Sequence, residues 1–505
     1  MALKNMHRRP LPFAASFLCL TVLAPLTAPA ATIVTGLITK TAGASNNYTL
    51  FSPNLTTTTY LINKNGNIVN QWESEHNPGL HGYLLEDGSL VRAAAAEGNS
   101  QIDATGGGGL IERFDWNGNK VWEFDYNDDS NFDDAVWQHH DIEIMPNGNI
   151  LMIAWETMSA AEAEQAGRDD TLPGGGAALY PEHIVEVQPD LESGSGGTIA
   201  WEWHATDHLV QDHDPTKDNY QGATGVADHP ELIDINYVSA GTPGGGAADD
   251  WMHANGIDYN AELDQIVLSV REYSEFWVID HSTDTDEAAG HTGGDSGLGG
   301  DLLYRWGNPQ TYDAGDASDR ILYYQHDAKW IEDGFPGDGN ITVFNNGFGQ
   351  PGTDLSSSLE IITPVDGFNY LLNPGDPYGP AGPTWSYTAP PADFSAIISG
   401  TQRLSNGNTL ITFGPHGAFV EVTPDGEVVW RYVNPYIAGG MLGPMDPPTP
   451  IGFVDLNNNF VFRATDYPQD FLISGLPEPS AFVLLFSSAS CLCGYGWRRK
   501  RKAAA

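Results

Sequence analysis

The stretch GTQRLSNGNTLITFGPHGAFVEVTPDGEVVWRYV, residues 400–433, decides the fold of this chain. Asn-Gly and Asp-Gly turns separate short runs that are rich in β-branched and aromatic residues, a pattern typical of antiparallel strands joined by hairpins. The stretch lacks the spacing of apolar residues that a long helix requires. It therefore predicts one unit of four antiparallel strands.

The same two kinds of turn recur along the chain. One kind precedes an apolar run, as in LEDGSLVR, MPNGNILMI and LSNGNTLIT, and the other ends in paired aromatic residues, as in DWNGNKVWEF, GGTIAWEW and PDGEVVWRY. Because the two kinds alternate, each pair frames one four-stranded unit. Five such units are predicted, at residues 80–126, 139–204, 253–307, 325–387 and 400–433.

Two further segments each resemble half a unit. They are TYLINKNGNIVNQW (59–72) and FVDLNNNFVFRATDY (453–467). Joined, they make a sixth unit that closes a ring, so the sequence predicts an all-β fold, a six-bladed β-propeller with terminal half-blades. A β-sandwich array is the main alternative, but it would not need matching half-units. Residues 158–168, within an insertion, are expected to form a short helix.

Both ends of the chain carry targeting patterns. Residues 1–30 have a basic start, an apolar stretch and Ala28-Pro29-Ala30, as in a secretory signal peptide. Residues 475–505 contain PEPS, an apolar run and the basic cluster RRKRK, and this tail resembles the PEP-CTERM sorting signal. The resemblance implies that an exosortase processes the tail after transient membrane insertion. A plain membrane anchor is the alternative at either end.

The body, residues 31–474, is expected to be one exported domain. Its destination would be the periplasm, outer surface or extracellular matrix of a Gram-negative bacterium. All three cysteines, Cys19, Cys491 and Cys493, fall in the terminal segments, so the body must be stable without disulfides. The net charge of −44 excludes nucleic acid as a partner.

Histidines recur just before the first strand of several units. In a propeller this strand lies along the axis, so such residues should surround one mouth of the central channel; they are His81, His139, His140, His253 and His326. The second strand returns to the same mouth, where Arg92, Glu156, Arg271 and His416 are expected. Such a cluster can ligate a metal, close strand ends, or bind an anion beside a nucleophile. Arg271 opposes a metal cation.

The motifs QHHDIEIMPNGN, DWMHANGIDYN, IVLSVRE, YRWGNP, QHDAKW and QRLSNGNTL resemble the bacterial aryl-sulfate sulfotransferases over nearly all of residues 47–470. The resemblance implies a six-bladed periplasmic propeller without cofactor or metal. It also implies transfer of a sulfuryl group from a phenolic sulfate ester to a phenol by a ping-pong mechanism through a sulfohistidine. No nucleotide sulfate donor would take part.

The resemblance also assigns roles to residues. His326, in QHDAKW, matches the nucleophile, and His253 and Asn255 match a His-x-Asn pair that binds substrate. Arg271 matches the arginine that binds the sulfuryl oxygens. His140 is preferred to His139 as the acid–base histidine, because aligning HHDI on QHDA puts His140 in register with His326. Characterised members have a disulfide, which this body lacks.

A second function class is a non-catalytic envelope or biofilm-matrix propeller that binds anionic ligands. Hydrolysis, with water as the acceptor, is a variant of the first class at the same site. The oligomeric state is left open, with a homodimer as one option.

Overall fold

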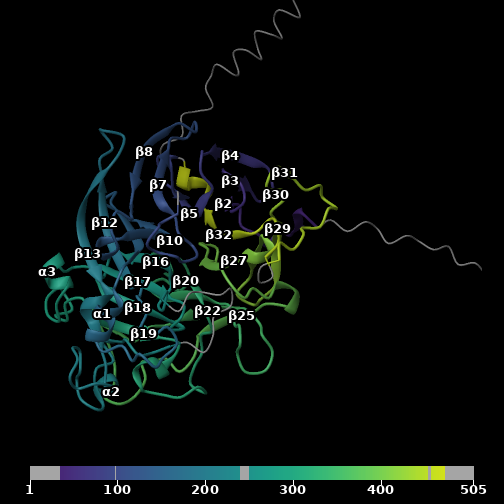
Figure 1. The fold of residues 1–505 in the computed structure, drawn as a ribbon. Helices are drawn as coiled ribbons and strands as arrows, with labels where there is room; N and C mark the ends of the chain where they lie inside the picture. The colour runs from purple at the N-terminus through teal and green to yellow at the C-terminus, as the bar shows by residue number, and fades with distance from the viewer. Residues whose placement is uncertain (1–33, 97, 239–248, 453–455, 473–505) are drawn as a thin grey trace, which may run out of the picture. The chain divides into compact units, whose positions relative to one another are not determined.

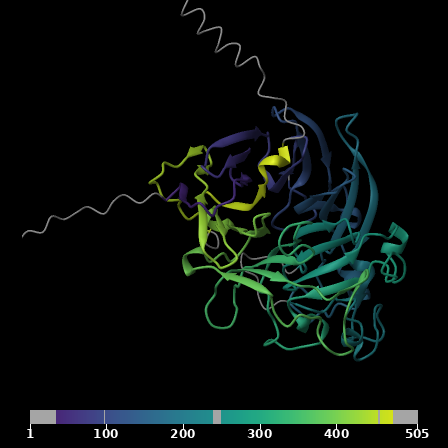
Figure 2. The same cartoon turned by 180° about the vertical axis from the view of Figure 1, so that it is seen from behind.

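Six four-stranded sheets radiate around a common axis, which confirms the predicted six-bladed β-propeller (Figure 1). The computed structural model describes residues 34–96, 98–238, 249–452 and 456–472. The first strands of neighbouring blades contact one another all the way around the axis, from β5 through β10, β16, β20, β26 and β32 back to β5. The same radial arrangement is seen from behind in Figure 2. The predicted signal peptide and the whole predicted sorting tail lie outside the described residues.

Blades 1 to 3 follow one another along the chain. Blade 1 is β5 (Pro78–Leu84), β6 (Leu90–Ala95), β7 (Gly109–Phe114) and β8 (Lys120–Asp125). Blade 2 is β10 (Val136–Ile144), β11 (Ile150–Glu156), β12 (Glu182–Pro189) and β13 (Gly197–His204), with the two-residue β9 (Asn127–Asp128) beside β10. Blade 3 is β16 (Ala254–Asn260), β17 (Gln265–Val270), β18 (Glu275–Asp280) and β19 (Leu302–Trp306).

Blades 4 and 5 repeat the pattern, and blade 6 joins the two ends. Blade 4 is β20 (His326–Trp330), β21 (Ile341–Asn345), β22 (Ser357–Ile361) and β25 (Trp385–Thr388). Blade 5 is β26 (Gly400–Arg403), β27 (Thr409–Phe413), β28 (Ala418–Val422) and β29 (Val428–Val433). Blade 6 is β2 (Tyr48–Pro53), β3 (Thr58–Asn63), β4 (Ile68–Glu73) and β32 (Val461–Tyr467).

The insertions between strands carry short elements. They are the helices α1 (Ala160–Gln165), α2 (Gly225–Asp228) and α3 (Thr285–Ala288), and the strand pairs β14 (Leu209–Val210) with β15 (Ile233–Asp234), β23 (Val365–Asp366) with β24 (Asn369–Tyr370), and β30 (Tyr436–Ile437) with β31 (Gly440–Met441). α1 confirms the predicted helix, and Ser159 and Glu162 form a capping box at its start. No helix in the described ranges is long and apolar enough to cross a bilayer.

The ring is closed by both ends of the chain, but not by two equal halves as predicted. The C-terminal segment supplies one strand, β32, which pairs with β2, and the N-terminal segment supplies three. Directly before β32 the chain makes a turn, in which the N–H of Phe460 bonds the carbonyl of Asn457, and the side-chain amide of Asn459 bonds the carbonyls of Asn434 and His416. The first N-terminal strand, β1 (Gly36–Lys40), was not predicted, and it adds a fifth strand to blade 5 beside β29.

The paired aromatic residues of the repeat hold neighbouring blades together. A tryptophan on the fourth strand of every blade donates its indole N–H to a backbone carbonyl in the last hairpin turn of the next blade. The six bonds, of 2.7–3.0 Å, are Trp72 to Asp115, Trp122 to Gly196, Trp203 to Gly300, Trp306 to Pro380, Trp385 to Pro424 and Trp430 to Lys64. Because indoles bury a large apolar surface with one polar atom that needs a partner, this position suits tryptophan.

Candidate active site

A shared irregularity in the inner strands positions the site. The pairing register shifts after His139 in β10 and after His326 in β20. At these bulges His140 has φ 52° and Asp327 has φ 58°, in the left-handed region that non-glycine residues avoid. In a regular strand, successive side chains point to opposite faces of the sheet. Each bulge interrupts this alternation at a histidine and the aspartate that follows it, His140-Asp141 and His326-Asp327.

The two aspartates converge on an arginine in the channel axis. Arg463 Nη1 lies 2.8 Å from Asp141 and 3.1 Å from Asp327, and all three side chains are buried. Gly400 leaves room for this group, because a Cβ there would come within 2.3 Å of the Asp327 carboxylate. The ion-paired group divides the channel into an upper mouth, where the inner strands begin, and a lower mouth, where they end.

The predicted histidines come together at the upper mouth. The rings of His140 and His253 have centroids 4.6 Å apart, and those of His140 and His326 lie 6.1 Å and 6.2 Å from the ring of Phe462. Arg271 belongs to the same group, since its backbone N–H donates to the carbonyl of His253. Residues from blades 2, 3, 4 and 6 thus share one small space.

His326 is held in a single tautomer. Its Nδ1–H donates to Asn346 Oδ1 at 2.7 Å, and its Nε2 accepts the backbone N–H of Ile398 at 3.1 Å. The lone pair on Nε2 therefore points toward the segment before β26. Asn255 lies behind the nucleophile position, where its amide donates to the carbonyl of Gln325. Its Oδ1 has no hydrogen-bond partner among the described residues.

The other two histidines are each backed by a buried carboxylate that the sequence analysis missed. His253 Nδ1 donates to Asp250 at 2.5 Å. His140 Nδ1 lies 2.8 Å from Nδ1 of His139, whose Nε2 lies 2.9 Å from Glu182. These contacts form a hydrogen-bonded chain from Glu182 through His139 to His140.

Trp155 contacts both the His139 chain and the carboxylate behind His253. Its ring stacks on His139 with centroids 3.7 Å apart, and its indole N–H donates to Asp250. Gly106 covers the other side of His140, because a Cβ there would come within 2.2 Å of the imidazole. Trp155 and Glu182 pair across β11 and β12, and packing of blade 2 against the segment before β16 adds Asp250, which precedes His253 by three residues in DDWMH.

Arg271 supplies a positive charge that is itself paired. Its Nη1 bonds Glu272 Oε1, and its guanidinium lies 5.2 Å from the ring centroid of Tyr324. Arg320, which the sequence analysis did not single out, lies 5.4 Å from the same ring. The site thus holds two guanidinium groups around one aromatic ring, a suitable surface for an aromatic anion.

The electrostatics favour neutral imidazoles. Burial and the positive charge of Arg271 hold the pKa of His326 well below its ordinary value. Burial and the neighbouring His253 lower the pKa of His140 in the same way, and burial lowers that of His139. Burial and Asp250 raise the pKa of Glu182 well above its ordinary value. The nucleophilic form of a histidine is the neutral one, with a lone pair on one ring nitrogen. In His326 this nitrogen is Nε2, which here accepts the N–H of Ile398.

Other residues expected at this mouth lie elsewhere. His81 sits lower in the channel, with Nε2 2.9 Å from Thr465 Oγ1, because β5 has its own register shift between Pro78 and Gly82. Arg92 pairs with Glu112 and bonds carbonyls of blade 6 and its connection. Glu156 pairs with His204, and His416 bonds the carbonyl of Phe394. Of the four second-strand residues, only Arg271 reaches the histidines.

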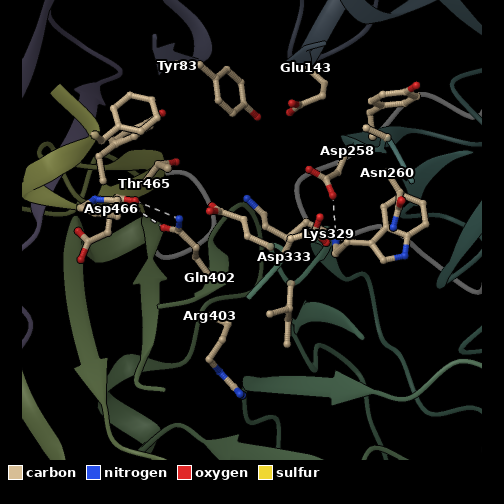
Figure 3. A pocket seen from close by; sticks show the side chains of 18 of the residues that line it. Tyr83, Glu143, Asp258, Asn260, Lys329, Asp333, Gln402, Arg403, Thr465 and Asp466 are labelled. Carbon is tan, nitrogen blue, oxygen red and sulfur yellow. Dashed lines mark hydrogen bonds between the residues drawn. The ribbon is translucent and has the colours of Figure 1, made fainter. Parts of the chain in front are cut away.

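A polar cavity of about 390 Å³ occupies the lower mouth (Figure 3). It takes one or more residues from each inner strand, among them Tyr83, Glu143, Asp258, Lys329, Gln402 and Thr465. Burial raises the pKa of Asp258 to about 7 and that of Glu143 well above its ordinary value. None of the residues expected to act in catalysis lines this cavity.

A comparison with protein families agrees with the family resemblance. The family model for arylsulfotransferase (ASST) matches residues 104–432, a range that contains His140, His253, Asn255, Arg271 and His326. No curated protein matches the chain significantly.

Solved structures that resemble the chain do so at low identity. A protein of unknown function from Bacteroides caccae has 10% identity and a TM-score of 0.40, covering 84% of this chain and 99% of that one. Virginiamycin B lyase from Staphylococcus aureus has 11% identity and a TM-score of 0.34, covering 81% and 90%. These likenesses are too distant to inform the activity. The family model spans well over half of the sequence, and the chain therefore belongs to the arylsulfotransferase family.

Proposed function

We propose that this protein is an aryl-sulfate sulfotransferase in which His326 is the nucleophile. The observation that carries the proposal is the state of His326: a buried, neutral imidazole whose Nδ1–H is held by Asn346, beside Arg271 and two further histidines. Such a group attacks an electrophilic sulfur through Nε2, while nearby cations stabilise charge on the sulfuryl oxygens.

The first half-reaction would load the enzyme. Nε2 of His326 forms a bond to the sulfur of the aryl sulfate, and the bond from sulfur to the aryl oxygen breaks. The leaving phenolate takes a proton from His140, which the chain through His139 to Glu182 can resupply. Arg271 and His253 donate to the oxygens of the transferring group, where charge accumulates in a loose transition state.

The second half-reaction reverses these roles. His140 removes the proton of an incoming phenol, its oxygen bonds the sulfur, and the N–S bond to His326 breaks. Water in place of the phenol would give hydrolysis. His326, His253 and Arg271 are only 2–6% exposed, so entry of the aromatic ring requires movement of the segments around Gly106 and Ile398 that cover them.

Export completes the proposal. The signal pattern in residues 1–30 and the sorting pattern in residues 475–505 would place the transferase in the envelope or matrix of a Gram-negative bacterium, after an exosortase processes the tail. The strongly acidic chain suits small-molecule substrates, an aryl sulfate and a phenol, better than nucleic acid.

A covalent-trapping experiment tests the proposal. Purified protein is incubated with 4-nitrophenyl sulfate and no acceptor, then digested under mildly basic conditions that preserve the N–S bond. Mass spectrometry should find a sulfuryl adduct on the peptide that bears His326, and addition of a phenol should remove it. Binding of the aryl sulfate without release of nitrophenol would refute the transferase and support an envelope protein that only binds anions.

A further inference from the structure

We propose that blade 2 carries a binding site for a zinc-type divalent cation, formed by Glu156, His183 and His204. The three residues come from the ends of β11, β12 and β13 and share one face of the sheet, since His183 pairs directly with His204 and with Ala154, two residues before Glu156. One ligand atom from each of the three lies within 4.8 Å of the others. This site goes beyond the sulfuryl transfer and does not depend on it.

The donor set is the first argument. Two imidazoles and one or two carboxylates are the ligands that zinc takes in proteins. Glu202 offers the second carboxylate, since its Oε1 lies 3.3 Å from His183 Nε2. Two ligand atoms bound to one zinc ion are roughly 3.4 Å apart, given bonds of about 2.1 Å and tetrahedral geometry. Small side-chain rotations therefore bring the three groups to coordination distance.

The second argument is a poorly bonded nitrogen. His183 is only 3% exposed, and its Nε2 makes no well-formed hydrogen bond, only the 3.3 Å contact with the Glu202 carboxylate. A metal ion between these two groups would satisfy both. Nδ1 of His183 lies 3.5 Å from the hydroxyl of Tyr126, which would orient the ring as outer partners of metal-bound histidines do.

Charge and access also fit. The imidazoles of His183 and His204 stack with centroids 4.1 Å apart, an arrangement that disfavours two protonated rings. The carboxylates of Glu156 and Glu202 lie against the two rings, so the neighbourhood is electronegative. The side chains of Glu156 and His204 are 19% and 31% exposed, which leaves an entry path.

A second group with similar composition provides a contrast. His208, His291 and Asp301 also lie within ligand distance of one another. Both ring nitrogens of His208 are already bonded, to Asp301 and to the carbonyl of Ala288, each at 2.8 Å. His208 therefore has no nitrogen left for an ion, whereas Nε2 of His183 makes only a longer contact, of 3.3 Å, with Glu202, itself a candidate ligand.

A bound ion would act on strand ends that also serve the upper mouth. Glu156 follows Trp155, which stacks on His139, and His183 follows Glu182, which bonds His139. The ion and the hydrogen-bonded chain would occupy opposite faces of the same pair of strands. Zinc would therefore restrain the segment that holds His139.

The test is metal binding by the whole purified protein after treatment with a chelator. Calorimetric titration with Zn²⁺ should give one site, and Co²⁺ should give visible absorption bands typical of low coordination. His204→Ala and Glu156→Gln change partly exposed side chains, and each should weaken Zn²⁺ binding about 100-fold or more. His291→Ala, in the contrasting group, is the matched control and should bind like the parent.

The thermal midpoint gives a second readout. Zn²⁺ should raise the Tm of the parent and of His291→Ala, and should leave that of His204→Ala and Glu156→Gln unchanged. The proposal is wrong if the parent binds no Zn²⁺, or if the two site variants, with native circular dichroism, bind it as tightly as the parent. Neither result would bear on the sulfuryl-transfer experiment, which contains no metal.

Discussion

The two ends of the axial channel are built from the same six strands but have different chemistry. At the upper mouth, His140, His253 and His326 are buried and close together, with Arg271 beside them. At the lower mouth, Glu143 and Asp258 surround Lys329 in an open polar cavity (Figure 3). Arg463, paired with Asp141 and Asp327, separates the two.

The comparison shows which end of this channel favours neutral histidines. At the upper mouth, burial and a nearby cation both disfavour protonation, so imidazole nitrogens retain their lone pairs. At the lower mouth, burial and like charges act on carboxylates and favour the protonated acid. His140, His253 and His326 gather at the upper end, and none of the three lines the lower cavity.

The largest expected effect is on catalysis by His326→Ala. Loss of the nucleophile should reduce aryl-sulfate turnover by at least about 10⁴-fold and remove the covalent adduct, while circular dichroism stays native. The matched control at the other mouth is Glu143→Gln, which should keep the parent rate. Equal losses in both variants would mean that the lower cavity takes part in the reaction.

The next largest effect concerns the group that separates the two mouths. Arg463→Ala leaves Asp141 buried without its paired cation, while Asp327 keeps Lys329, so urea denaturation should show a loss of about 3–5 kcal/mol in unfolding free energy. Arg113→Ala removes a pair with the exposed Asp87 and should cost at most about 1 kcal/mol. If Arg463→Ala loses as little unfolding free energy as Arg113→Ala, the ion pairs of Arg463 contribute little to stability.

A smaller effect is expected for the carboxylate behind His253. Asp250→Asn keeps the shape of the side chain but removes the charge that holds Nδ1–H of His253, and turnover should fall about 10²–10³-fold with little change in stability. Asp258→Asn, the corresponding change at the lower mouth, should leave turnover unchanged. If Asp250→Asn retains full turnover, orientation of His253 is not needed for transfer.

The smallest effect is the pH dependence of stability at the lower mouth. Burial raises the pKa of Asp258 from 3.8 to about 7, so the folded protein keeps a proton that the unfolded chain releases. Folding stability contributed by this group therefore falls as the pH rises from 3.8 to about 7. The side chain of the Asp258→Asn variant cannot ionise. At pH 8 the free energy of unfolding of this variant should therefore be about 1–2 kcal/mol higher than that of the parent.

The measurement for this last prediction is urea denaturation at pH 5 and pH 8. The difference in unfolding free energy between Asp258→Asn and the parent should be absent or much smaller at pH 5, where the carboxyl is protonated in the folded state. A gain of the same size at both pH values would instead indicate a better packed or better bonded amide.

Much of the site could be anticipated from local motifs. HHD and QHD were aligned on one another, and the structure shows both as a bulge with a histidine at the upper mouth and an aspartate on Arg463. His81 did not follow this rule, because nothing in LHGYLL reports where β5 shifts its register. Glu182 and Asn346 were missed because each meets its histidine from a different part of its blade, and Asp250 was missed although it lies only three residues before His253.

The sequence by itself determined the number of blades, the four-stranded repeat and the paired aromatics, because turns and strand periodicity depend on neighbours along the chain. Only the tertiary structure decided how three strands and one share blade 6, which carbonyl each tryptophan bonds, and which carboxylate backs each histidine. The pairing in blade 6 joins the two ends of the chain and the tryptophan bonds join separate blades, whereas the carboxylate contacts lie within blade 2 or the segment before β16. The energy of all these contacts depends on burial and distances that no local pattern records.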